Sequence, residues 1–511
     1  EPLCTYRIAN FKTASADKDA GAAFLKYKDF KPYVDYFNSM EDENIAQAIP
    51  NARASQWMEE NIPLFECSQK NFEEMYYYRW WTLRKHIKET PVGYGMTEFL
   101  VNRSYADKYN LIACAIGHHI YESRWLRNPE YLNQIIHTWY RGNEGGPMAK
   151  MTKFSSWNAD AVLGRYMVDG NKEFLLDMVK DLEAEYARWE KTNRLPNGLY
   201  WQGDVQDGME ESISGGRRKQ YARPTINSYM YGNAKALSLI GIMTGDEGMA
   251  MKYGLKADSI KTLVQDKLWN TDHHFFETMR GDASAEVREA IGYIPWYFNL
   301  PDASSKYTVA WKEVMDEKGF SAPYGLTTAE RRHPEFRTHG VGKCEWDGAI
   351  WPFASAQTLT AMANFMNNYP QTVLTDSVYF HHMERYVESQ HHRGRPYIGE
   401  YLDEVTGYWL KGDQERSRYY NHSTFNDLMI TGLIGLRPRM DNTVEVNPLI
   451  PEGKWDYFCL DNVLYHGRNL TILWDKDGSR YQRGKGLHIY VDGKEVGHSD
   501  TLTRVLCENV L

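Results

Sequence analysis

Residues 199–216 and 226–243 read LYWQGDVQDGMEESISGG and INSYMYGNAKALSLIGIM. In the second stretch, apolar residues recur every three or four positions, at Ile226, Tyr229, Met230, Ala234, Leu237 and Ile240. This spacing places them on one face of an α-helix. The first stretch is a loop rich in glycine, aromatic and acidic residues. A long acidic loop that leads into an amphipathic helix is therefore the unit from which we predict the fold and the site.

Similar amphipathic segments continue through most of the chain. We expect helices at residues 71–86, 109–125, 131–140, 158–167, 172–191, 226–243, 248–268, 306–318, 346–366, 372–390 and 424–436. The loops between them differ greatly in length, and long loops are tolerated where function needs them. Many short antiparallel helices with elaborated loops on one side favour an (α/α)6 toroid over a simple bundle. An α-solenoid is the rival fold, but the chain shows no repeat of fixed period.

The two ends of the chain differ from this helical body. Residues 1–68 have weak periodicity, and we interpret them as an N-terminal arm packed on a toroid of residues 69–437. In residues 438–511, short stretches alternate polar and apolar residues, and turn signals such as Asp477-Gly478 and Asp492-Gly493 separate these stretches. We therefore expect a small C-terminal β-domain, whose simplest role is structural support.

The composition restricts the possible partners. The 511 residues carry a net charge of −9, so the chain lacks the positive field that attracts nucleic acid. No apolar run reaches the ~18–20 residues that a membrane span requires. Aromatic residues make up 14%, and flat rings suit a sugar-binding cleft, although they also fill large helical cores. Glu1 in place of an initiating Met fits a processed N-terminus, so we expect a periplasmic or secreted location.

The cysteine and histidine patterns do not indicate a metal site. The cysteines are Cys4, Cys67, Cys114, Cys344, Cys459 and Cys507, and no two of them form a CxxC pair. We expect most of them to be free buried thiols. The run from His118 to Glu122 is not an HExxH motif, and helix packing explains it more simply. We therefore expect no cofactor and no catalytic metal, while loop carboxylates leave a Ca²⁺ site open.

The acidic loop quoted above concentrates Asp204, Asp207, Glu210 and Glu211 near Trp201. Cleavage of a glycosidic bond needs one carboxylic acid to protonate the leaving oxygen and a second carboxylate on the opposite face of the sugar. A loop beside aromatic rings raises a carboxyl pKa by desolvation, which keeps the acid protonated near neutral pH. The structural alternative is an acidic surface loop, and the neighbouring tryptophan and glycines weaken that alternative.

Three further blocks combine acidic, aromatic and small residues. They are residues 344–353 (CEWDGAIWPF), 396–409 (PYIGEYLDEVTGYW) and 419–426 (YYNHSTFN). In the first block, Asp347 fits a helix cap as well as it fits a contact with sugar. Glu400 begins an acidic run in the second block that is too rich in glycine and aromatic residues for an ordinary solvated turn. In the third block, His422 is interpreted as a polar cleft residue.

The order of these blocks resembles the six-hairpin glycosidases of glycoside hydrolase families 37 and 63, the trehalase and processing-glucosidase group, with their bacterial mannosylglycerate-hydrolase-like relatives. In that group the general acid is the Asp of an ESGWD-like segment, and residues 207–212 (DGMEES) occupy the same place here. This implies Glu210 as the acid, with Asp207 as a competitor because Glu replaces Asp. Residues 346–352 (WDGAIWP) are similar to a WRGPVWP-like block. Residues 400–407 (EYLDEVTG) are similar to an ENYNPxTG-like segment, which implies Glu400 as the base.

The resemblance covers roughly residues 70–437 and implies hydrolysis by single displacement with inversion. Glu210 would protonate the glycosidic oxygen of an α-linked oligosaccharide or small glycoside, while Glu400 deprotonates the attacking water. This geometry needs the two carboxyl groups about 6.5–9.5 Å apart. Other loop residues are expected to hold the glycone by stacking and hydrogen bonds. They are Trp201, Asp204, Arg223, Asn227, Trp346, Asp347, Trp351 and His422.

Two other classes of function stay open. A polysaccharide lyase or a sugar epimerase on the same toroid would use a Tyr or His base and a positive cleft for uronate. Arg217-Arg218-Lys219 with Tyr221 is compatible with that chemistry. A non-catalytic glycan-binding protein would tolerate the loss of either carboxylate, whereas hydrolysis needs both at a fixed spacing. The sequence leaves the oligomeric state undetermined.

Overall fold

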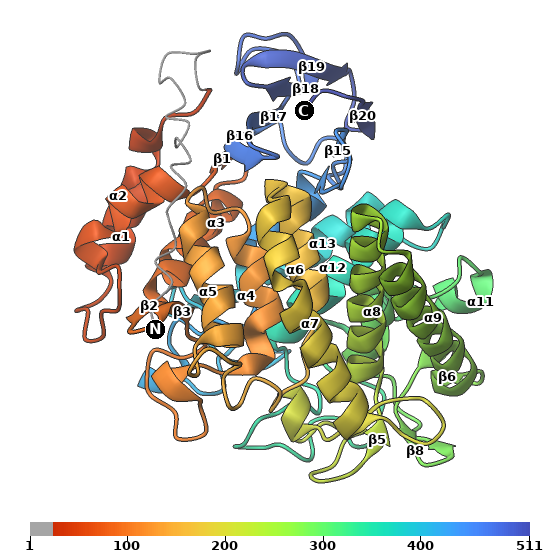
Figure 1. Ribbon diagram of the computed structural model, residues 1–511. Coiled ribbons are helices and arrows are strands. Elements are labelled where there is room, and N and C mark those ends of the chain that lie inside the picture. The colour runs from red at the N-terminus through yellow and green to blue at the C-terminus, as the bar shows by residue number, and fades with distance from the viewer. Residues whose placement is uncertain (1–23) are drawn as a thin grey trace, which may run out of the picture.

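The computed structural model describes residues 24–511, and its helices form an inner ring and an outer layer (Figure 1). The inner helices are α4 (Ile116–Ser123), α6 (Asn158–Asp169), α8 (Pro224–Thr244), α10 (Ile294–Tyr297), α12 (Pro352–Asn368) and α14 (Asn426–Leu428). Each contacts the next, and α14 contacts α4, which closes the ring. The outer helices alternate with them in sequence as α3 (Lys70–Lys85), α5 (Pro129–Arg141), α7 (Lys172–Asn193), α9 (Glu247–Leu263), α11 (Ser305–Thr308) and α13 (Asp376–Ser389). The predicted (α/α)6 toroid is confirmed.

Some of the helices differ from their predicted bounds for local reasons. The segment at 306–318 forms α11 and then a 3-10 helix, Val309–Val314. The segment at 424–436 forms α14 and then a π-helical turn, Met429–Leu433. The helix expected from residue 346 begins only at Pro352, whose fixed φ suits a first turn. Helix α10 was not predicted, because four residues are too few to show a helical period.

The inner helices share one polarity, and their N-terminal ends follow the loops that carry the predicted site. Helix α8 begins after the acidic loop, which contains β4 (Trp201–Gln202) and β5 (Tyr221–Ala222). Strands β5 and β8 (Met279–Arg280) lie at the lower end of the ring in Figure 1. Helix α12 begins after the block at 344–351, and α14 begins after residues 419–425. The fold therefore gathers distant loops at one end of the toroid.

The N-terminal segment and the C-terminal domain share a sheet. Its antiparallel order is β1 (Leu64–Cys67), β16 (Tyr457–Tyr465), β17 (Arg468–Asp475), β18 (Gly486–Val491) and β19 (Lys494–Ser499). A second sheet has the order β14 (Leu436–Arg437), β15 (Val444–Val446) and β20 (Val505–Cys507). Before β1, the chain forms α1 (Lys31–Ser39) and α2 (Asn51–Asn61), which pack on each other and on α3. The predicted C-terminal β-domain is present, and strand β1 extends it.

The remaining strands form small ladders within the loops. They are β2 (Ile87–Thr90), β3 (Gly93–Met96), β6 (Trp269–Asn270), β7 (Phe275–Phe276), β9 (Ala283–Ser284), β10 (Ser321–Ala322), β11 (Gly325–Leu326), β12 (His391–His392) and β13 (Arg395–Pro396). Of the cysteines, all five that fall within residues 24–511 are free, and Cys344 alone among these is partly exposed. Cys4 lies outside the described residues. No helix in this part of the chain combines the length and apolarity that a bilayer span requires.

Candidate active site

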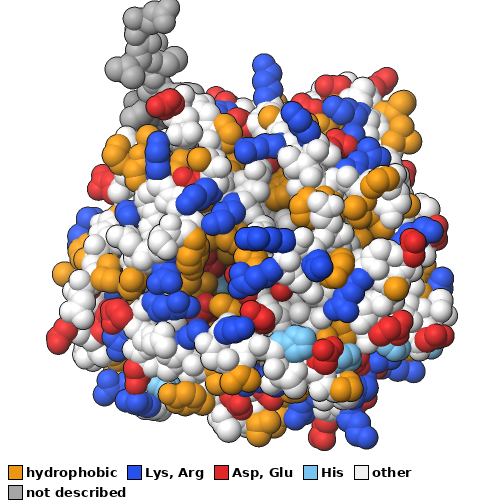
Figure 2. All heavy atoms as spheres, turned by 90° about the horizontal axis from the view of Figure 1, so that it is seen from below, with side chains coloured by type: hydrophobic (Ala, Val, Ile, Leu, Met, Phe, Trp, Pro, Cys, Tyr) orange, Lys and Arg blue, Asp and Glu red, His pale blue; other side chains and the backbone are white. Residues whose placement is uncertain are grey.

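The end of the ring that carries the loops is hollowed. Figure 2 shows this end from below, where Lys and Arg side chains surround a hollow with acidic side chains inside it. The charge of Glu400 raises the pKa of Glu210, and both charges raise the pKa of Glu98, so these acids form one electrostatic cluster. This cluster lies where the N-termini of the inner helices converge. Positive helix ends favour negative charge nearby.

Glu210 lies on the acidic loop, two residues after a tight turn. Gly208 makes this turn with φ of +71°, and a Cβ there would lie 3.3 Å from the Cβ of Cys114, so the loop passes close to the residues that precede α4. Burial raises the pKa of Glu210 to about 7, helped by the negative charges of Glu400 and Asp204. Near neutral pH, a large share of the molecules therefore holds a proton on Glu210.

Glu400 is the neighbouring carboxylate, and it is almost fully buried. The Arg416 guanidinium and the Ser417 hydroxyl each donate to one of its oxygens over 3.3 Å. The thiol of Cys344 lies beside both glutamates, since burial and then the charges of Glu210 and Glu400 raise its pKa to about 12. The structure thus brings together the two glutamates that the sequence singled out.

Asp207 has a different role from the one that the sequence allowed. It is buried, and one carboxylate oxygen accepts from Arg223 Nε at 2.7 Å and from the Thr225 hydroxyl at 2.5 Å. The Ser155 hydroxyl donates to its other oxygen. Both carboxylate oxygens of Asp207 are therefore already occupied by protein donors. It anchors the acidic loop.

Arg223 and Asn227 are also corrections to the predicted glycone-binding set. Neither has any exposed surface. Besides Asp207, Arg223 binds the hydroxyl of Ser214 over 3.2 Å. The Asn227 side chain exchanges two hydrogen bonds of 2.8 Å with the backbone of Tyr200. Both side chains hold the acidic loop from behind instead of facing the cleft.

Asp204 and Trp201 occupy the start of the same loop. Asp204 is nearly buried, accepts from the backbone N–H of Val205 at 2.8 Å, and contributes to the raised pKa of Glu210. Trp201 lies half-exposed in β4. Among the described residues, no hydrogen bond joins its ring to Glu210 or Glu400. Asp204 is therefore part of the acidic cluster, while Trp201 stays a predicted sugar contact.

Aromatic rings form one wall of the site. Trp351 stacks between Trp346 and Tyr401, with centroid distances of 4.5 and 4.4 Å. The indole N–H of Trp346 has no hydrogen-bond partner within residues 24–511. All three rings are at most 3% exposed, so the stack is a buried wall and its contact with a sugar stays a prediction.

Asp347 does not cap α12, because that helix begins at Pro352. Its carboxylate Oδ2 accepts from the backbone N–H groups of His339 and Gly340, at 2.6 and 3.0 Å. The other oxygen, Oδ1, is buried without a partner in the described chain. Buried polar atoms are normally paired, and Asp347 has no exposed surface, so its contact with a sugar hydroxyl stays a prediction.

His422 lies between the aromatic wall and the glutamates. Its ring packs on Tyr420 at 3.9 Å and lies 6.1 Å from Trp351, measured between ring centroids. Burial lowers the pKa of His422 well below its ordinary value, so the ring is neutral. Neither ring nitrogen has a hydrogen-bond partner in the described part of the chain. A neutral imidazole with both nitrogens free can donate to one hydroxyl and accept from another.

Glu98 is a member of the cluster that the sequence did not reveal. It follows β3 and is almost fully buried. The Tyr420 hydroxyl and the Cys114 thiol each donate a hydrogen bond to the Glu98 carboxyl group, at 2.9 and 3.3 Å respectively. Burial raises the pKa of Glu98 to about 8, with added contributions from the charges of Glu400 and Glu210. A single acid after a hairpin carries no motif, so only the three-dimensional structure identifies this third carboxyl group.

Replacing Glu98 with glutamine is expected to stabilise the protein at alkaline pH. The pKa of Glu98 is raised from 4.5 to about 8 on folding, so its contribution to stability is full below pH 4.5 and is lost as the pH rises through 8. The Tm of Glu98→Gln should therefore exceed the wild-type Tm by on the order of 2 °C at pH 9 and differ little at pH 5. Thermal melts at both pH values, with exposed Glu415→Gln as the control, measure this. A constant difference across pH would contradict it.

The other candidate ligand groups have structural roles or lie elsewhere. Glu122 accepts hydrogen bonds from the backbone N–H groups at the start of α14, and His118 and His119 bind backbone carbonyls. Among the described residues, one group has the spacing of a cation site, formed by His273, Glu277 and Glu286. Hydrogen bonds from His273, Asn270 and Ser284 already occupy Glu277.

Paired glutamates beside an aromatic wall, at the loop end of an (α/α)6 toroid, define the class of protein, a glycoside hydrolase. Residues 108–423 match the mannosylglycerate hydrolase MGH1-like glycoside hydrolase domain, and residues 436–498 match the C-terminal domain of glycosyl hydrolase family 65. The first match covers more than half of the chain. The chain therefore belongs to the MGH1-like glycoside hydrolase family.

Solved structures agree on the fold. A protein named sialidase is 82% identical with a TM-score of 0.96, and the match covers 97% of this chain but 46% of that protein. This chain thus spans about half the length of that relative. The GH63 mannosylglycerate hydrolase from Thermus thermophilus, in complex with glucose, has 11% identity and a TM-score of 0.50 over 70% of this chain and 99% of its own. The GH78 rhamnosidase of a Bacillus species has 10% identity and a TM-score of 0.56, and the match covers 81% of this chain and 40% of the rhamnosidase.

Proposed function

We propose that this glycoside hydrolase cleaves its substrate by single displacement with inversion, with Glu210 as general acid and Glu400 as general base. The observation that carries the proposal is the contrast between two neighbouring carboxyl groups. Burial raises the pKa of Glu210 to about 7. Glu400 instead lies against a guanidinium and a hydroxyl. Pairs of acids whose environments differ in this way commonly divide the acid and base roles.

Each environment suits one step of the reaction. Glu210 can give its proton to the departing glycosidic oxygen, and it regains a proton from solvent because it is partly exposed. Glu400 can accept a proton from the water that attacks the anomeric carbon, while Arg416 keeps its orientation fixed. The bond from the anomeric carbon to the leaving oxygen breaks as the bond to water forms on the opposite face. The product would then have the inverted configuration.

Glu98 and His422 are proposed to hold the glycone. At pH below 8, Glu98 is a neutral carboxyl group that can both donate to and accept from sugar hydroxyls. The His422 ring packs on Tyr420, whose hydroxyl donates to Glu98. Both ring nitrogens of His422 lack a hydrogen-bond partner among the described residues. The aromatic stack of Trp346, Trp351 and Tyr401 would support one face of the substrate.

The charges at the mouth favour a substrate that carries an anionic group. Arg217 and Lys343 approach Glu211 at 3.9 and 3.7 Å, and both side chains are largely exposed. Lys411 lies over the ring of Tyr401 at 5.7 Å. Arg217 and Lys343 share this one carboxylate, and Lys411 forms no ion pair within residues 24–511. A small α-glycoside or oligosaccharide with a carboxylate would meet complementary charge there.

The direct test is proton NMR of the first-formed product during hydrolysis of a panel of α-glycosides, both neutral and carboxylated. The proposal predicts that the initial anomer is the opposite of the substrate anomer. Initial formation of the same anomer would overturn the single-displacement mechanism. An unsaturated uronate product without water uptake would instead identify a lyase.

The salt dependence of KM tests the charge at the mouth. For a carboxylated glycoside, KM should rise about threefold between 0.05 and 0.5 M NaCl, because salt screens exposed charges. KM for a matched neutral glycoside should stay constant. Lys343→Met should raise KM for the carboxylated substrate alone, whereas Lys494→Met, on distant β19, should leave it unchanged. Equal salt effects on both substrates would contradict the prediction.

A sialidase reaction is a second candidate because of the name of the 82% identical protein. Sialidases use a tyrosine nucleophile, and the Tyr420 hydroxyl lies 2.9 Å from Glu98. However, burial and the charge of Glu98 raise the pKa of Tyr420 well above its ordinary value, which opposes formation of a phenolate. Hydrolysis of an aryl sialoside that Tyr420→Phe abolishes, and Glu400→Gln does not, would favour this candidate.

A further inference from the structure

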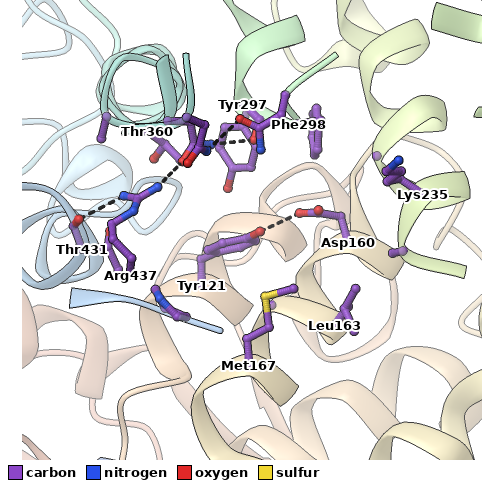
Figure 3. Close-up of a pocket in the computed structure, with 18 of the residues that line it drawn as sticks. Tyr121, Asp160, Leu163, Met167, Lys235, Tyr297, Phe298, Thr360, Thr431 and Arg437 are labelled. Carbon is purple, nitrogen blue, oxygen red and sulfur yellow. Dashed lines mark hydrogen bonds between the residues drawn. The ribbon is translucent and has the colours of Figure 1, made fainter. Parts of the chain in front are cut away.

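A second pocket lies at the other end of the toroid axis, away from the catalytic loops. Its cavity volume is about 600 Å³, within the range of small-molecule sites. Its walls come from the inner helices, from Asp160 near the start of α6 and Lys235 in the middle of α8 to Tyr121, Met167 and Asn368 near the ends of α4, α6 and α12. Arg437 of β14 completes the lining (Figure 3). The C-terminal domain therefore helps to form this pocket.

A layer of buried aromatic side chains separates the pocket from the catalytic end. Trp157, just before α6, donates from its indole nitrogen to the Tyr297 hydroxyl over 3.1 Å. Its ring packs 5.0 Å from that of Tyr229 and 6.2 Å from that of Phe353, measured between centroids. A Cβ on Gly117 would lie 2.2 Å from Trp157, so this ring is packed directly against α4. A molecule in the second pocket would not touch the catalytic glutamates.

Arg437 brings a positive charge to this pocket without an ion pair to a carboxylate of residues 24–511. Its guanidinium donates to the carbonyl of Thr431 over 3.0 Å and to the side-chain oxygen of Asn364 over 2.7 Å, both neutral groups. No carboxylate oxygen of residues 24–511 lies within 4.0 Å of it. The two nearby acids bind other arginines, Asp427 with Arg124 and Glu445 with Arg439. Arg437 is only partly exposed, burial lowers the pKa of its guanidinium, and the charges of Glu445 and Asp427 act on it from beyond ion-pair distance.

The opposite wall offers groups that bind hydroxyls. The Tyr121 hydroxyl donates to Asp160 Oδ2 at 2.6 Å, and the other oxygen of Asp160 has no donor among the described residues. Burial raises the pKa of Asp160 to about 7, so this carboxyl group can donate as well as accept near neutral pH. The rings of Tyr121 and Tyr297 lie 5.7 Å apart, edge to face, beside it. Figure 3 shows Asp160 and Lys235 on neighbouring helices across the cavity from Arg437.

We propose that this pocket binds a sugar acid of monosaccharide size. Its carboxylate would pair with the Arg437 guanidinium, which supplies the missing counterion. Its hydroxyls would bind Asp160, and its apolar face would lie on the tyrosine rings. Lys235, which has no partner within the described residues, would add a second positive charge. The site does not depend on the assignment of Glu210 and Glu400.

Isothermal titration calorimetry with glucuronate, glucose, glucose 6-phosphate and inorganic phosphate tests the proposal. Glucuronate is expected to bind saturably, while glucose binds at least tenfold more weakly. Arg437→Gln and Asp160→Asn should each weaken glucuronate binding about tenfold or more. Because these buried variants could fail to fold, the surface variant Lys235→Met provides a further test, with a smaller expected loss of about threefold. Lys252→Met, an exposed lysine on α9, is the matched control.

The outcomes separate this site from the catalytic cleft. Binding that Glu400→Gln leaves intact and Lys235→Met weakens supports the proposal. Binding that Glu400→Gln weakens and Lys235→Met leaves unchanged places glucuronate in the cleft and overturns it. Tight binding of inorganic phosphate or glucose 6-phosphate without glucuronate would define a phosphate site and would also overturn it. The absence of saturable glucuronate binding would have the same consequence.

Discussion

Glu400→Gln is expected to lower kcat by about 10³-fold, with little change in KM, because glutamine keeps the shape of the side chain but cannot accept a proton. Steady-state rates on a carboxylated α-glycoside measure both parameters. Glu415→Gln is the matched control, because Glu415 is exposed, lies one residue from Arg416 and pairs with Arg418.

A variant that retains more than a tenth of wild-type kcat would exclude Glu400 as the base. In that case Glu98 is the next carboxyl group in the cluster to examine, since the charges of Glu400 and Glu210 both act on it. The two nearby acids of the same block do not compete for the role. Asp403 and Glu404 lie 3.5 and 3.6 Å from the Arg337 guanidinium, and Asp403 also accepts from the backbone of its own turn.

Glu210→Gln is expected to slow cleavage in proportion to how much the leaving group needs a proton. For an alkyl glycoside, kcat/KM should fall about 10²–10⁴-fold, the usual contribution of a general acid. For a dinitrophenyl glycoside, whose leaving group departs as a stable anion, the loss should be less than tenfold. The wild-type rate should decline above pH 7, because the pKa of Glu210 is raised to about 7. This decline should disappear in the variant.

The variant Asp207→Asn tests whether Asp207, in place of Glu210, is the general acid. Removal of one partner from the buried Asp207–Arg223 pair is expected to cost about 3–5 kcal/mol of folding stability. The loss of activity should then be similar for the alkyl and dinitrophenyl substrates and should follow the fraction of folded protein. A loss confined to the alkyl substrate would reverse the assignment and make Asp207 the acid. Thermal melts beside the two kinetic assays distinguish these results.

The sequence predicted the architecture well because its signals are local. Helices α7 and α8 have long apolar faces with clear ends, such as the glycine that closes α8 at Gly245. The sequence singled out Glu210 and Glu400 because each lies in a glycine- and aromatic-rich loop with a recognisable order along the chain. What sequence could not supply was the direction of each side chain. Arg223 and Asn227 lie within five residues of each other at the start of α8, yet both point into the protein.

Non-local contacts account for the other differences. Glu98 enters the site because the backbone N–H of Asn421 donates to its carbonyl over 3.0 Å, and the two residues are far apart in sequence. Strand β1 is a strand because β16 pairs with it, and its four residues show no alternation of their own. The sequence allowed Asp347 as a helix cap, but α12 starts five residues later, where Pro352 and the stacked tryptophans determine the turn.

The pairing of Leu64 with Asp461 has a consequence for how the protein is made. A ribosome releases residues 64–67 long before their partner strand has been synthesised, so this stretch waits with open backbone groups while the helical ring assembles. Such edges invite pairing with other chains. Expression of residues 24–437 alone should therefore give aggregated material, and a tag or fusion is better placed at the C-terminal end than between residues 438 and 511.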